Sequence, residues 1–159
     1  MAIETYPVDN RLGTSTNNNA APGQLGEFVT FSVPAGSAVA LTTAVAANVT
    51  SISLTAGDWD INAQVDHLIS ATASVTQLNA SMSLTTAALS PQAGGSGLGT
   101  DATATASFAA MVPTANITQG IVMVRLSVSA TTTVFLVAQD IFTLGTISAF
   151  GTIRARRVR

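Results

Sequence analysis

The chain has no cysteine and no lysine, and charged residues make up only 9% of its 159 residues. The absence of cysteine excludes disulfides, thiolate nucleophiles and zinc–thiolate sites. An ordinary soluble domain carries roughly 25% charged residues. Because so few charges remain to keep copies of the chain apart in water, the composition favours burial of much of its surface in an oligomer.

Aromatic residues and long apolar runs are also scarce. The chain has one Trp and one Tyr, and this disfavours a sugar-binding surface, which usually displays aromatic platforms. No stretch approaches about 18 uninterrupted apolar residues, so we expect no membrane span and no membrane partner. The N-terminus lacks a basic region followed by an apolar run, so we expect no signal peptide. A net charge of −2 disfavours a nucleic-acid partner.

Alternation of apolar and polar residues dominates the chain after the first 26 residues. In "WDINAQV" the apolar residues Trp59, Ile61, Ala63 and Val65 fall on one face of an extended strand. "VMVRLSV" likewise predicts Val122, Val124, Leu126 and Val128 on one face, with Arg125 opposite. The predicted strands lie in EFVTFSV, SAVALTT, NVTSISL, WDINAQV, QLNASMSL, ATASFAAMV, VMVRLSV, TTTVFLVAQ and GTISAFGTIRARRV.

This pattern predicts an all-β protein of eight or nine strands with no helix. Short strands separated by regular turn signals are typical of two packed antiparallel sheets. Eight strands in two sheets is the number found in a jelly roll, although periodicity does not reveal the order of the strands. The residues of "TTTVFLVAQ" are densely β-branched, and we expect this strand to be buried on both faces.

The first 26 residues form a separate segment, the N-terminal arm, ahead of a jelly-roll domain at residues 27–159. Asn, Gly, Thr and Pro dominate the arm, and no helical or strand period is visible in it. One interpretation is a flexible leader. The other is an arm that becomes ordered only on a neighbouring subunit, with Tyr6, Val8 and Leu12 as its contact residues.

Candidate catalytic and ligand-binding residues are few. The single histidine, His67, continues the inward series that begins at Trp59, and no nucleophile signature accompanies it. Asp58 and Asp60 share one face of a strand about 7 Å apart, but calcium usually takes six or more oxygens from a loop. The glycine-rich "GGSGLG" lacks the lysine and the strand–helix context of a phosphate-binding loop. We therefore expect no enzyme, no metal and no cofactor.

Positive charge is concentrated at the C-terminus, in "FGTIRARRVR". Alternation places Arg154 and Arg156 on the face opposite Ile153, Ala155 and Arg157, as in a strand that ends in charge. A nucleic-acid-binding arm usually has more cations, interleaved with aromatic residues. We expect these arginines to form ion pairs with aspartates between strands or between subunits. The residues predicted to pair are Asp58, Asp60, Arg154, Arg156, Arg157 and Arg159.

Four segments together resemble a module of tailed bacteriophages and prophages. They are GTSTNNNAAPGQLGEFV, NVTSISLTAGDWDI, TTTVFLVAQ and FTLGTISAFGTIRARRVR. The resemblance covers roughly residues 13–159, and the combination of T-A-G-D-W-D with I-x-A-R-R-V-R is its most specific part. The module is similar to small trimeric jelly rolls of the C1q and tumour-necrosis-factor type. It occurs in virion surface proteins and brings no catalytic residues with it.

The resemblance implies a homotrimeric structural protein on the outer surface of a phage particle, made in the cytoplasm of the bacterial host. One expectation is a capsid decoration (cement) protein that binds the major capsid protein and stabilises the head. The alternative is a tail-fibre, collar or head-fibre tip that attaches to the host. In tail fibres the module usually ends a long shaft, whereas here it is almost the whole chain, which favours a protein seated directly on a capsid or tail.

Overall fold

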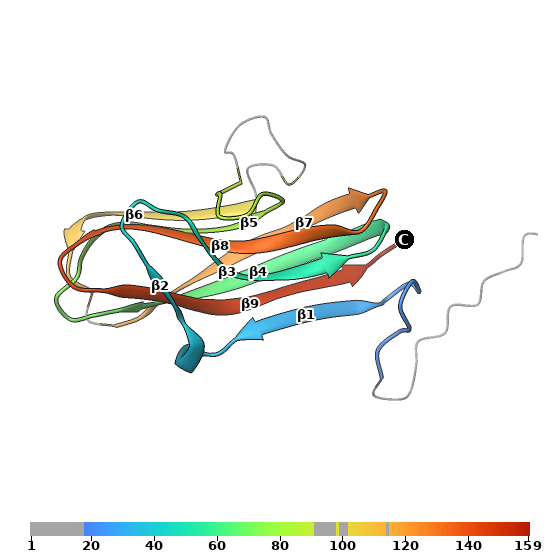
Figure 1. Cartoon of the computed structure of the whole chain (residues 1–159), viewed down its shortest axis with the longest axis horizontal. Helices are drawn as coiled ribbons and strands as arrows, with labels where there is room; N and C mark the ends of the chain where they lie inside the picture. The colour runs from blue at the N-terminus through green and yellow to red at the C-terminus, as the bar shows by residue number, and fades with distance from the viewer. Residues whose placement is uncertain (1–17, 91–97, 99–101, 114) are drawn as a thin grey trace, which may run out of the picture.

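The computed structural model describes residues 18–90, 98, 102–113 and 115–159. These residues form nine strands in two antiparallel sheets that pack face to face (Figure 1). Sheet A contains β1 (Phe28–Val33), β2 (Val39–Leu41), β4 (Gly57–Ile69), β7 (Ile117–Val128) and β9 (Ile147–Arg157). Sheet B contains β3 (Ala47–Leu54), β5 (Ser74–Ser83), β6 (Thr103–Met111) and β8 (Thr132–Thr143). The only helix in the described part is η1 (Ala35–Ser37), a single 3₁₀ turn between β1 and β2.

The order of the strands is that of a jelly roll. Sheet A runs β1-β9-β4-β7, with β2 also paired to β9, and sheet B runs β3-β8-β5-β6. Because β1 and β2 pair with successive parts of β9, they act as one interrupted edge strand. Counting them as one strand gives the orders 1-8-3-6 and 2-7-4-5, the two interlocked Greek keys of a jelly roll. The predicted all-β jelly-roll sandwich is therefore confirmed.

The core lies between the two sheets and follows the alternation in the sequence. Trp59, Ile61 and Val65 of β4 are fully buried, as predicted from "WDINAQV". In β8, consecutive residues are buried on both faces, and Leu136 and Val137 are each 0% exposed. Burial on both faces matches the expectation for this β-branched strand, which lies in the interior of sheet B between β3 and β5.

The prediction that Val122 faces inward is wrong. Its side chain is 61% exposed, and that of Met123 is 63% exposed. Ile61 pairs with Val124 whereas Ala63 pairs with Ile121, so β7 holds one more residue than β4 over this interval. Such a β-bulge reverses the alternation on the bulged strand. The inward series therefore changes from odd to even residue numbers at the bulge, and both bulge residues face solvent.

Candidate functional site: the C-terminal strand and its charged face

Arg157 is the buried cation at the end of β9, only 5% exposed. Its Nε donates to Oε2 of Glu27 at 2.9 Å, and its Nη1 donates to the carbonyl oxygen of Ala56 at 2.7 Å. Its Nη2 donates to the hydroxyl of Thr55. The guanidinium also lies over the ring of Trp59. Arg157 thus ties together the end of β9, the turn before β4 and the residue that precedes β1.

Glu27 fixes the base of the N-terminal arm to the domain. Backbone bonds join the N–H of Arg157 to the carbonyl of Glu27 at 2.9 Å and the N–H of Gly26 to the carbonyl of Arg157 at 3.0 Å. The Glu27 carboxylate also accepts from the N–H of Gly23 at 2.8 Å. Burial raises the pKa of Glu27, but the Gly23 N–H and the Arg157 guanidinium together outweigh it and hold that pKa below its ordinary value. The described end of the arm is therefore anchored by a charged cluster.

Two further ion pairs lie at the surface of sheet A. Arg159 Nε is 2.7 Å from Oδ2 of Asp58, and the Arg125 guanidinium contacts the Asp60 carboxylate. The pKa of Asp58 is held below its ordinary value, chiefly by the hydrogen bond from the Ser127 hydroxyl and also by the nearby Arg159 guanidinium. Desolvation opposes this and raises the pKa by less. The pairs join β4 to the C-terminus and to β7, so they contribute to the register of the sheet.

The structure brings together only some of the residues predicted to form ion pairs. Asp58 pairs with Arg159, but Asp60 pairs with Arg125 rather than with a terminal arginine. Arg157 pairs with Glu27, which sequence reasoning missed because it lies 130 residues away. The predicted arm contacts Tyr6, Val8 and Leu12 lie outside the described residues.

Arg154 and Arg156 are the exposed cations of β9. Both side chains point to the outer face of sheet A, as the alternation predicted. Within the described ranges neither has a carboxylate within 4.0 Å, whereas Arg125, Arg157 and Arg159 each have one. Asp60 lies opposite Arg156 in the pairing of β4 with β9, but its carboxylate pairs with Arg125, so neither exposed arginine of β9 has an ion pair in the described chain.

His67 forms a buried polar brace between the sheets. Its Nδ1 is 2.8 Å from Oδ2 of Asp140 on β8, and its Nε2 is 2.9 Å from Oε1 of Gln119 on β7. The Gln119 amide nitrogen donates to the carbonyl of Leu78 at 3.2 Å, so its oxygen faces the histidine. The Gln119 oxygen therefore accepts from Nε2, and Nδ1 and the Asp140 carboxyl group share the other hydrogen bond. His67 and Asp140 are 0% exposed.

This brace has the character of a structural element rather than a catalytic site. Its groups are buried, and their hydrogen bonds run to one another and to the backbone. The sequence signal for Asp140 was its place in the inward series Val134, Leu136, Ala138. That signal could not identify His67 as its partner, because 73 residues separate the two.

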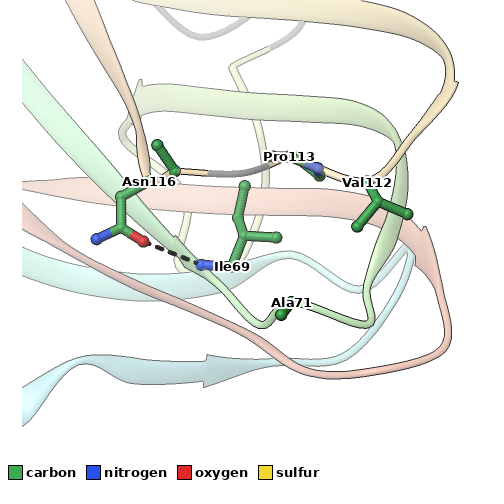
Figure 2. A pocket seen from close by; sticks show the side chains of 6 residues that line it. Ile69, Ala71, Val112, Pro113 and Asn116 are labelled. Carbon is green, nitrogen blue, oxygen red and sulfur yellow. Dashed lines mark hydrogen bonds between the residues drawn. The ribbon is translucent and has the colours of Figure 1, made fainter.

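A partly open pocket of about 590 Å³ lies at one end of the sandwich. Figure 2 shows Ile69 and Ala71 on one side and Val112, Pro113 and Asn116 on the other. The one polar side chain drawn is that of Asn116, whose Oδ1 accepts from the N–H of Ile69 at 3.4 Å. Ligand sites usually combine an apolar lining with several convergent polar groups. The described residues that line this pocket lack that combination.

In the part of the chain that the structure describes, no cluster of three or more His, Cys, Asp or Glu side chains is arranged to hold a metal ion. No helix there has the length and apolar character needed to cross a membrane. Most of the glycine-rich segment at residues 90–101 lies outside the described residues.

Comparison of the whole chain with protein-family models, with curated proteins and with solved structures finds no match.

Proposed function

We propose that this protein is a structural component of a phage virion, a homotrimeric decoration protein that binds the outer surface of the capsid and stabilises the head. The observation that carries the proposal is the anchored arm. The Glu27–Arg157 cluster fixes the chain at the end of the jelly roll, so the preceding residues leave the domain at a defined point. A rigid domain with an arm that starts from a fixed base suits a protein that links neighbours in an assembly.

Three further features support this proposal. The low content of charge favours burial of surface between copies. Sheet A carries exposed Val122 and Met123 on β7 and, on the other side of β4, the exposed Arg154 and Arg156 of β9. The resemblance of the C-terminal and "TAGDWD" segments to phage surface modules points to the same class. If the arms hold three copies together, weak contacts of each copy with the capsid add up to strong attachment through avidity.

The first test is the number of copies per particle, by quantitative mass spectrometry against the major capsid protein. Hundreds of copies in a simple ratio to the capsid protein would support a decoration protein. A few to a few tens of copies would instead support the tail-fibre, collar or head-fibre tip. Absence from the particle would overturn both.

A second test removes residues 1–17, ahead of the anchored base. The truncated protein keeps Glu27 and its bonds to Arg157, so we expect it to fold as the full chain does. If the arm links neighbours, the truncated protein should lose most of its binding to capsids in a sedimentation assay. Unchanged binding would contradict the role given to the arm.

A further inference from the structure

We propose that residues 4–12 of one copy dock on the outer face of sheet A of a neighbouring copy in the trimer, across Arg154, Arg156 and the β7 bulge. This inference rests on the homotrimer of the proposed function.

The receiving surface is a row of residues that crosses sheet A from one edge to the other. Thr30 of β1 pairs with Arg154 of β9, and Arg154 pairs with Asn62 of β4. Asn62 lies opposite the bulge of β7, where Val122 and Met123 are exposed. Because paired residues point to the same side of a sheet, this row places a cation and two apolar side chains on one open face.

No carboxylate of the described domain forms an ion pair with Arg154 or Arg156, so both guanidinium groups can accept one from another copy. Glu27, Asp58 and Asp60 are each bound to an arginine other than Arg154 or Arg156. Asp140 is buried against His67, and Asp66 bonds to Gln64 and Thr118. The remaining acids of the chain are Glu4 and Asp9 in the arm and Asp101 in the glycine-rich segment.

The arm has the complementary pattern. In an extended chain alternate residues share a face, so Glu4, Tyr6, Val8 and Leu12 lie together. That face offers one carboxylate and three apolar side chains, which match the cations and the apolar bulge. The row across β1, β9, β4 and β7 spans three strand spacings, about 14 Å. An extended segment from Glu4 to Val8 has about the same length, so it can place Glu4 near the arginines and Val8 near the β7 bulge.

The path of the chain favours a neighbouring copy as the receiver. In Figure 1 residues 18–26 leave β1 on the side away from β9 and β4. The Glu27–Arg157 cluster fixes this departure. Residues 12–18 can extend by about 20 Å beyond the described base. The described base of the arm, residues 18–26, therefore points away from β9 and β4 of its own copy (Figure 1).

Disulfide trapping tests the contact directly, because the chain contains no cysteine of its own. One preparation carries Val8→Cys and a second, with a size tag, carries Met123→Cys, and the two are refolded together and oxidised. A matched control replaces Met123→Cys by Ser51→Cys, an exposed position on β3 of sheet B. We expect the bond between different copies to form at least 10-fold more with the β7 cysteine than with the β3 cysteine.

Equal trapping at the two positions would overturn the proposal. So would a double variant, Val8→Cys with Met123→Cys, that forms its bond only within one chain. The molar mass of the unmodified protein, measured by light scattering, shows whether a wrong docking site or a wrong proposed function explains the missing bond. A trimer without the bond contradicts the docking site alone, whereas the absence of a trimer contradicts the proposed assembly as well.

Charge exchange gives a second, independent readout. Trypsin cleaves after arginine, and Arg11 is the only cation in the arm. We expect Arg154→Glu with Arg156→Glu to speed cleavage after Arg11 by about 10-fold, and a further Glu4→Arg to restore most of the protection. Cleavage that is already fast in the unmodified protein, or no rescue by Glu4→Arg, would contradict the proposal.

Discussion

The guanidinium carbon of Arg157 lies 4.3 Å from the centroid of the Trp59 ring. Trp59 is fully buried at the start of β4, and its Nε1 donates to the carbonyl of Thr55 at 2.9 Å. Arg157 also reaches Thr55 and Ala56, so the stacked pair closes one end of the sandwich. A cation held over an aromatic face and paired with a carboxylate keeps favourable contacts that a lysine at the same place would make only in part.

Replacement of Arg157 should destabilise the fold strongly. Arg157→Ala removes the partner of Glu27 and uncovers Trp59, and loss of one member of a buried ion pair typically costs about 3–5 kcal/mol. Arg154→Ala, on the exposed face of the same strand, should change the free energy of unfolding by less than about 0.5 kcal/mol. Urea unfolding of both variants measures the difference. Similar losses in the two variants would contradict the role given to Arg157.

Acid should weaken the anchor at the base of the arm. The folded-state pKa of Glu27 is held below its ordinary value of 4.5, because the Gly23 N–H and Arg157 outweigh the opposing effect of burial. A lowered pKa contributes stability that is present above the unfolded value and is lost as the pH falls through the folded value. Stability should therefore decline below about pH 4.5, and Glu27→Gln should show less of this decline. An identical acid profile for the variant would rule out this contribution.

Gly151 of β9 should tolerate no side chain. A Cβ at this position would lie 2.1 Å from the backbone oxygen of Gln64 on β4, a contact that real Cβ atoms do not make. Gly151→Ala should therefore force the two strands apart at a cost of about 1–3 kcal/mol. Gly120 of β7 is the matched control, because a Cβ there would meet nothing within 4 Å. Thermal unfolding should separate the two variants, and equal melting temperatures would contradict the close approach.

The His67 brace should behave as a coupled unit. Asp140→Leu alone leaves His67 buried without its acceptor and should cost about 3–5 kcal/mol. Combining it with His67→Leu should cost less than the sum of the single changes, because the second change removes the group left unpaired. A double-mutant cycle by urea unfolding measures the coupling. Simple additivity would mean that the brace contributes no specific interaction.

The strands, and the side of the sheet on which most of their side chains lie, could be predicted from the sequence. Alternation in "WDINAQV" and in the C-terminal segment placed Trp59 inward and Arg154 outward, and the structure has them there. The β7 bulge could not be predicted, because the alternation of apolar and polar residues continues through Val122. Only the pairing of β7 with β4 shows the extra residue. A local pattern carries no information about which strand a given strand will meet.

Alternating polarity was sufficient to predict many half-buried strands, because such a strand needs only one apolar face to pack against the core. Which charged side chains meet could not be predicted in this way. Arg157 finds Glu27 across 130 residues, and Asp60 takes Arg125 rather than a terminal arginine. These pairings depend on the order of the strands and on their register. The same arrangement left Arg154 and Arg156 without an ion pair in the described chain, because Asp60, which lies opposite Arg156, pairs with Arg125.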